Sequence, residues 1–181
     1  RDKFTVADRQ AQFDAATRVK GLFGEMSDLV AKVNAVRAQA AAAAAKLPVH
    51  DATRKRLDAL DDKAEAIRKT IGAPPQGGAI TGEERLREHT DELYGAIMSY
   101  EGKPADYQIQ DIDTLKRELG DVEQDFAKFQ GGDLAKTNAA LRAARLPEIS
   151  VPNGATGSVS NGAGGLSRSE REALRAHWQL H

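Results

Sequence analysis

The residues of this sequence that could perform acid–base or metal chemistry gather in the segment 80–104, ITGEERLREHTDELYGAIMSYEGKP. His89 lies there among several carboxylates, a combination that serves in general acid–base catalysis and in metal binding. Di-metal sites in helical bundles require Glu-x-x-His motifs on facing helices, and this sequence contains none. Thr81 and Glu84 match a capping box instead, and a helix dipole favours Glu83 and Glu84 in the first turn. We therefore predict a helix with a solvated acidic face and no catalytic role for His89.

The buried face of that helix is predicted from its apolar spacing. Steps of three and four residues place one row on a single side of an α-helix: Leu86, Thr90, Leu93, Ile97 and Tyr100. The charged residues then fall mostly on the other faces, where water solvates them: Arg85, Arg87, Glu88, Asp91 and Glu92.

No other pattern in the sequence gathers catalytic residues. The G-x-S-x-G, H-E-x-x-H, P-loop and G-x-G-x-x-G motifs are all absent. His50 falls in an expected loop, and His177 and His181 are four residues apart in the tail but lack a third ligand. Glycoside hydrolysis needs two carboxylates that flank a sugar, yet no acid here falls on an apolar stripe where burial would raise its pKa. We predict no catalytic, cofactor-binding or metal site in this chain.

Charge and composition argue against nucleic-acid and membrane partners. The chain carries 26 Lys and Arg against 27 Asp and Glu, so it has no net field for a polyanion. The short basic run 54–56 is followed at once by Asp58, Asp61 and Asp62, which is typical of a solvated helix end. No apolar run approaches the ~20 residues of a transmembrane helix, and cysteine is absent. Because the chain begins with Arg1, we expect a cropped or processed piece of a longer protein.

Helices are the elements that would position any functional residue, and the longest is expected over residues 13–47. Two apolar rows recur there at seven-residue steps: Val19, Met26, Val33, Ala40 and Leu47, and Leu22, Leu29, Val36 and Ala43. This spacing is typical of a helix in a bundle or coiled coil, and Phe23 and Val30 widen the stripe. Thr5 with Asp8 predicts a capped start, and Pro48 the end.

Small residues within this helix have two interpretations. The alanines of residues 40–45 favour helix and would let a neighbouring helix approach closely, as would Gly21 and Gly24. Alternatively, the two glycines are simply tolerated, each at a cost of about 1 kcal/mol relative to alanine.

Further helices follow the first. One begins at Asp51 and ends at Gly72, with a stripe of Leu57, Leu60, Ala64, Ile67 and Ile71. Another follows Pro104, with a stripe of Ile112, Leu115, Leu119, Val122, Phe126 and Phe129. The sequence GGD at residues 131–133 is expected to interrupt it, with Asp133 capping a further short helix that ends near Leu146.

We predict an all-α fold, an up-and-down bundle of about four helices with a long first helix, over residues 1–149. Residues 150–165, SVPNGATGSVSNGAGG, indicate a flexible linker because they are rich in Gly, Ser and Asn. Residues 166–181 predict a short amphipathic tail helix, with Ser167 and Glu170 as a capping box and Trp178 on its apolar face.

Three stretches of the helical body carry a family resemblance: QAQFDAATRVKGLFGEMSDLVAKVNAVRAQ, ITGEERLREHTDELYGAIMSYEGKPADYQ and LAKTNAALRAARLPEI. They resemble the C-terminal helical region of large bacterial proteins of the glycosyl-hydrolase or sortilin-like type with BNR-repeat β-propellers. The likeness covers residues 1–149 and not the tail. It implies an exported parent, periplasmic or extracellular, whose propellers hold any ligand or glycan. It supplies no catalytic residue to this segment.

Three functions follow as hypotheses. The first is a non-catalytic helical accessory or interaction domain, whose partner is the parent's β-propeller or a second copy of the chain. The second is a contribution to the active unit of a glycoside hydrolase. The third is a self-assembling filament or coat component, which the long first helix favours.

Overall fold

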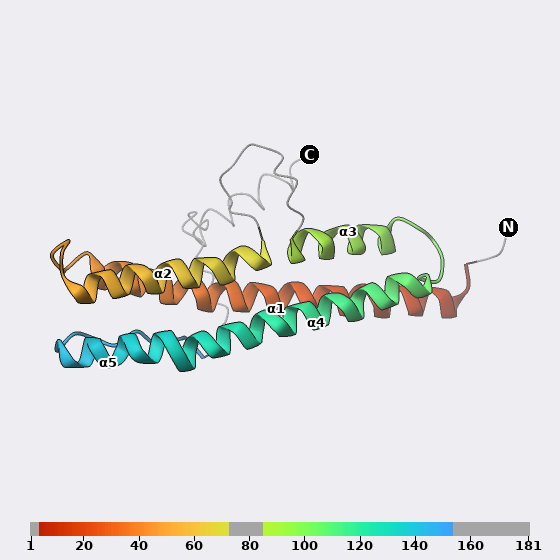
Figure 1. Ribbon diagram of the computed structural model, residues 1–181. Helices are drawn as coiled ribbons and strands as arrows, with labels where there is room; N and C mark the ends of the chain where they lie inside the picture. Colours follow the sequence, from red (N-terminus) through yellow and green to blue (C-terminus); the bar gives the residue numbers. More distant parts are fainter. Residues whose placement is uncertain (1–3, 73–84, 154–181) are drawn as a thin grey trace, which may run out of the picture.

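The computed structural model describes residues 4–72 and 85–153 and confirms an all-α bundle with a long first helix. Its elements are α1 (Val6–Ala44), α2 (Ala52–Ile71), α3 (Leu86–Met98), α4 (Asp106–Phe129), the π-helical turn η1 (Gln130–Leu134) and α5 (Ala135–Ala143). They form three rods (Figure 1). The first rod is α1, the second is α2 and α3 end to end, and the third is α4, η1 and α5. The second rod runs antiparallel to the other two.

α1 begins at the predicted cap. The Thr5 hydroxyl accepts a hydrogen bond from the Asp8 backbone N–H at 3.1 Å, and the Asp8 carboxylate accepts one from the Thr5 N–H at 3.0 Å. This is a capping box, and the side-chain hydrogen bond with Thr5 lowers the pKa of Asp8. The helix therefore starts at Val6, directly after the predicted cap, and it ends at Ala44, before the expected stop at Pro48. Leu47, expected in its last turn, lies in the connection to α2.

A single hydrophobic core runs along all three rods. The predicted stripes supply most of it: Val19, Leu22, Met26, Leu29, Val33, Val36 and Ala40 from α1, Leu57, Leu60, Ala64 and Ile71 from α2, and Ile112, Leu115, Leu119, Phe126 and Phe129 from α4. Phe23 packs edge-on against Tyr94 of α3, with ring centroids 6.5 Å apart. Gly21 and Gly24 face open space, so they do not mediate a close helix approach and are simply tolerated.

An ion network joins α1 to α2 beside this core. The Arg37 guanidinium donates to Asp61 at 2.8 Å and also to Glu65. Glu65 in turn accepts two hydrogen bonds from Arg68, each of 2.7 Å. The Arg37 and Glu65 side chains are only 29% and 21% exposed, so solvent screens this pair less than a surface ion pair.

The prediction that Tyr100 continues the buried row of the third helix is wrong. α3 ends at Met98, and Tyr100 is 69% exposed in the following loop. The reason is a side-chain cap. The Gln12 amide donates to the carbonyls of Ile97 and Tyr100, both at 2.7 Å, and so occupies carbonyl oxygens that would accept from backbone N–H groups if the helix continued. Leu86, Thr90, Leu93 and Ile97 are buried as expected. The predicted capping box of Thr81 and Glu84 lies outside the described residues.

The sequence GGD interrupts the α-helix where predicted, but by a π-helical turn and not by a break with a new cap. The chain passes from α4 through η1 into α5 without a break. A π-helical turn contains one residue more than an α-helical turn, which lets Phe129 and Leu134 both face the core although they are five residues apart. Asp133 does not cap a helix; its carboxylate pairs with Lys63 of α2 at 2.5 Å.

After α5 the chain turns back along the bundle in extended form. The Arg145 N–H donates to Arg142 at 3.0 Å and the Leu146 N–H donates to Leu141 at 2.9 Å, which is a Schellman motif. Ile149 is buried, and Val151 packs against the core. Contacts with the bundle thus continue past the predicted domain boundary at residue 149. Neither described range contains a helix long and apolar enough to cross a bilayer.

Candidate interaction surfaces

The tip of the bundle where α1 begins exposes a group of large apolar side chains. α1 and α4 both start there and α3 ends there (Figure 1). The group, called here the aromatic end, comprises Val6, Phe13, Met98, Tyr100 and Tyr107. Phe13 is 66% exposed and Tyr107 62%. Among the described residues, Val49 is the one other exposed large apolar side chain, and it lies at the opposite tip.

Polar contacts hold the aromatic end in place. Gln12, next to Phe13, donates one hydrogen bond to the Ile97 carbonyl of α3 and one to the Tyr100 carbonyl of the following loop. An ion pair between Arg18 and Asp113 joins α1 to α4. The exposed rings are therefore presented on anchored backbone, a property that lowers the entropic cost of binding.

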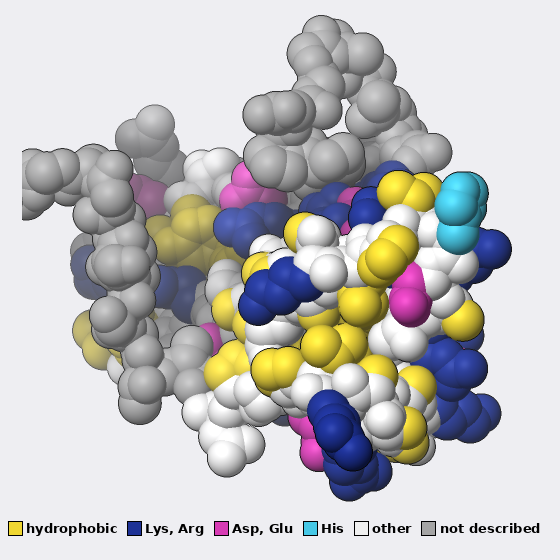
Figure 2. Space-filling model, turned by 90° about the vertical axis from the view of Figure 1, so that its left-hand side faces the viewer, with side chains coloured by type: hydrophobic (Ala, Val, Ile, Leu, Met, Phe, Trp, Pro, Cys, Tyr) yellow, Lys and Arg dark blue, Asp and Glu magenta, His cyan; other side chains and the backbone are white. Residues whose placement is uncertain are grey.

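The two tips of the bundle differ in charge. Charges of both signs surround the aromatic end, with Asp8, Glu101 and Asp106 as the acids and Arg9 and Lys103 as the cations. Figure 2 looks onto the opposite tip, where Lys and Arg side chains border hydrophobic ones. This tip, called here the basic end, comprises Lys46, Val49, Lys55, Arg142 and Arg145, all of them exposed. The described part of the basic end thus carries mainly cations, whereas the aromatic end carries charges of both signs.

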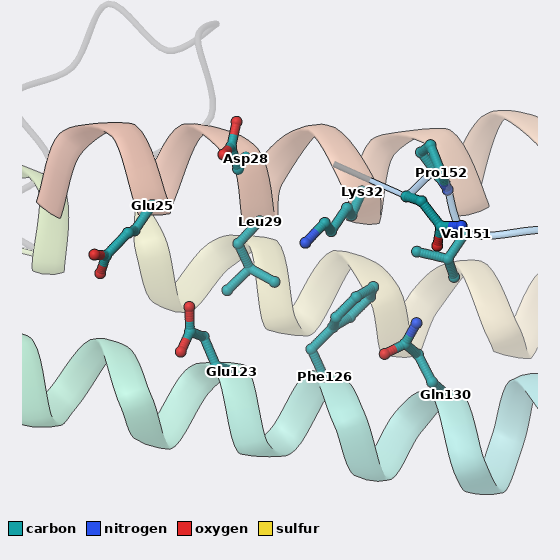
Figure 3. A pocket seen from close by; sticks show the side chains of 10 residues that line it. Glu25, Asp28, Leu29, Lys32, Glu123, Phe126, Gln130, Val151 and Pro152 are labelled. Carbon is teal, nitrogen blue, oxygen red and sulfur yellow. The ribbon is translucent and has the colours of Figure 1, made fainter. Parts of the chain in front are cut away.

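A groove of about 590 Å³ lies between α1 and the third rod (Figure 3). Leu29 and Phe126 form its apolar floor, and Val151 and Pro152 close one side of it. Its polar lining consists of Glu25, Asp28, Lys32, Glu123, Gln130 and Asn153. Three carboxylates and one lysine, Glu25, Asp28, Glu123 and Lys32, thus surround a small apolar floor.

Two side-chain amides clamp the extended segment beside this groove. Asn138 donates to the Ile149 carbonyl and accepts from the Ile149 N–H, both at 2.9 Å. On the other side, Gln39 donates to the Ser150 carbonyl at 2.7 Å and accepts from the Ser150 N–H at 3.0 Å. Each side-chain amide therefore forms the same pair of hydrogen bonds with the backbone that a neighbouring β-strand would form. This clamp cannot be predicted from the sequence, because nothing in the periodic pattern distinguishes Gln39 and Asn138 from other polar residues on helix surfaces.

His89 lies in a shallow depression of about 360 Å³ between α3 and α4. Glu92, Asp111 and Glu118 also line it, and all three are exposed. Arg87, Asp91 and Glu92 are exposed, as expected for a solvated face, whereas Arg85 and Glu88, also predicted there, are half-buried. Within the described ranges, no group of three or more His, Asp and Glu residues has the geometry to hold a metal ion.

The other described residues that were considered for a functional role lie apart from one another. His50 is exposed in the turn before α2, and the Arg54 guanidinium donates to the Leu47 carbonyl at 3.0 Å. Lys55 and Arg56 are exposed in the first turn of α2. His177, His181 and the predicted tail helix lie outside the described residues.

Comparisons of the chain with protein-family models, with curated protein sequences and with solved structures find no match. The resemblance to BNR-repeat proteins therefore stays a prediction.

Proposed function

We propose that this chain is a non-catalytic helical interaction module that binds a protein partner through the aromatic end. The observation that carries the proposal is that five large apolar side chains are exposed on three segments that begin or end at one tip of the bundle; one of them, Tyr107, also borders the depression between α3 and α4. Aromatic side chains and Met are enriched in the centres of protein interfaces. Burying them returns about 25 cal/mol for each Å² of apolar surface removed from water.

The partner that the family resemblance favours is a β-propeller of the same longer, exported protein. In such a parent the propeller would hold the ligand or glycan, and the helical bundle would pack on it as an accessory domain. The basis is the likeness of residues 1–149 to the helical region that follows the propellers in BNR-repeat, sortilin-like proteins.

A double substitution tests the aromatic end. Phe13→Ser with Tyr107→Ser in the full chain should weaken binding to the separately produced propeller region at least about tenfold, measured by titration calorimetry. Both residues are exposed, so the helical circular dichroism should not change. Val49→Ser at the other tip is the matched control and should leave the affinity as it was. Equal affinities for the double variant and the unchanged chain would contradict the proposal.

The depression around His89 supports the second hypothesis, a contribution to a glycoside hydrolase, because carboxylates are the catalytic groups of that chemistry. Truncation of the parent protein just before Thr5 of this chain, which deletes the helical segment, distinguishes the two hypotheses. An interaction module leaves kcat on a small soluble substrate unchanged, whereas a catalytic contribution is lost with the segment.

A further inference from the structure

The groove between α1 and the third rod lies where the described part of the chain stops. Asn153 and the two residues before it line the groove, and the sequence continues from Asn153 into residues 154–181. We propose that residues 166–181 of the same chain dock in this groove, with their arginines against its carboxylates and Trp178 on its apolar floor. The inference concerns the flank of the bundle and does not depend on the proposed function of the aromatic end.

The course of the extended segment is the first support. Ser150 is hydrogen-bonded to Gln39 of α1, whereas Asn153 lines the groove together with Lys32, about 10 Å nearer the start of α1. The segment therefore advances along α1 toward the groove, and the rest of the groove, beside Glu25, lies ahead of it (Figure 3). Asn153, from which residues 154–181 continue, thus stands at one end of the groove.

Charge is the second support. Glu25 and Asp28 are three residues apart on α1, Glu123 faces them from α4, and all three are exposed. They take part in no ion pair among residues 4–72 and 85–153. The groove therefore presents carboxylates that are available to a cationic segment.

The sequence of the segment matches this lining. Arg168, Arg171 and Arg175 recur at steps of three and four residues, which places them in one row on the predicted helix, and Trp178 continues the row. Glu170 lies outside the row. Three cations next to an indole complement three carboxylates around an apolar floor, and such complementarity orients a bound segment.

Tethering selects this segment as the occupant. Leu29 and Phe126 are each only 5% exposed, so the floor alone would hold a separate protein weakly. Residues 154–165 are rich in Gly and Ser, and a chain of that length and composition spans about 20 Å on average. Such a short tether gives an effective concentration of about a millimolar. A surface too small for a separate partner therefore suffices for the chain's own segment.

Tryptophan fluorescence of the full chain tests the inference, because Trp178 is the only Trp in the sequence. Docking covers the indole and protects it from quenching by acrylamide. Glu25→Lys with Glu123→Lys places like charges against the arginines, so at low salt it should raise the quenching constant at least about twofold.

A charge exchange identifies the contact. Arg171→Glu with Arg175→Glu should release the indole in the same way, and combining these changes with the two groove substitutions should restore its protection, because the opposite charges are rebuilt in reverse. Glu92→Lys with Glu118→Lys, an equal charge change at the depression around His89, is the control and should leave the quenching unchanged.

The substituted residues of the bundle are exposed, so helical circular dichroism should be the same in all variants. The inference is overturned if acrylamide quenches the unmodified chain as strongly as the groove variant, or if the combined variant stays unprotected. It is also overturned if the control releases the indole, which would locate the segment in the other depression. Protection that rises with protein concentration would overturn it as well, because a tethered segment binds independently of concentration and the segment of a second copy does not.

Discussion

Arg145 occupies a position that favours glycine, and its stability cost can be measured. Arg145→Gly should raise the free energy of unfolding by about 0.5–1 kcal/mol, because Gly adopts φ +57° without strain. Urea denaturation at a dilution that keeps the chain monomeric gives the value. Lys136→Gly, on an exposed face inside α5, is the control and should lower stability by about 1 kcal/mol. A loss of stability in Arg145→Gly would show that the arginine side chain makes a stabilising contact within its own chain.

Glu65 links two arginines and makes stability depend on pH. Its hydrogen bonds with Arg68, helped by the charge of Arg37, lower its pKa. A carboxyl whose pKa is lowered on folding contributes stability above its unfolded-state pKa and loses that contribution as the pH falls through the folded-state value. Glu65→Gln should therefore lower the free energy of unfolding by about 1–3 kcal/mol at pH 7.

Acid titration completes the test of Glu65. The stability difference between the unchanged chain and Glu65→Gln should shrink as the pH falls below about 4, where the unfolded chain binds the proton first, and should vanish once the pH is below the lowered folded-state pKa of Glu65. Glu118→Gln, an exposed acid, should change stability by less than about 0.5 kcal/mol. A Glu65 difference that stays constant down to pH 2 would mean that the carboxylate charge does not matter.

At the scale of elements, the clamp of Gln39 and Asn138 sets the position of the extended segment. Gln39→Ala or Asn138→Ala removes two hydrogen bonds to backbone and should destabilise the chain by about 1–2 kcal/mol. The amides of Ile149 and Ser150 should exchange with deuterium at least about tenfold faster, because local opening becomes easier. Asn34 is exposed on α1, the helix that carries Gln39. Asn34→Ala is therefore the control and should leave this exchange unchanged.

The elements that sequence predicts well are those set by local chemistry. The caps at Thr5 and Asp51 need only neighbouring backbone groups, and the apolar stripes need only helical periodicity, so both follow from sequence. The π-helical turn and the clamp do not follow, because they depend on contacts across the bundle, such as Asp133 with Lys63. The same holds for the aromatic end: Tyr100 fits a helical stripe, and only the Gln12 cap removes it from the core.

At the scale of the whole molecule, one continuous core predicts one cooperative unit. Leu119 is 1% exposed on α4, and Leu119→Ala should lower the free energy of unfolding by about 2–5 kcal/mol. The transitions followed by far-ultraviolet and near-ultraviolet circular dichroism should coincide, since Tyr94 and Phe23 pack against the same core. Val49→Ala, at an exposed site, should change stability little. Separate transitions would show that the rods unfold independently.

The path of the chain along the flank has a practical consequence for labelling. Asn138 and Gln39 pin residues 149–150 between the rods, away from both tips, whereas Thr5 enters at the aromatic end. A small probe attached at Ser150 should therefore leave binding at the aromatic end unchanged. The same probe attached at Thr5 should weaken that binding, because it would stand beside the exposed side chains.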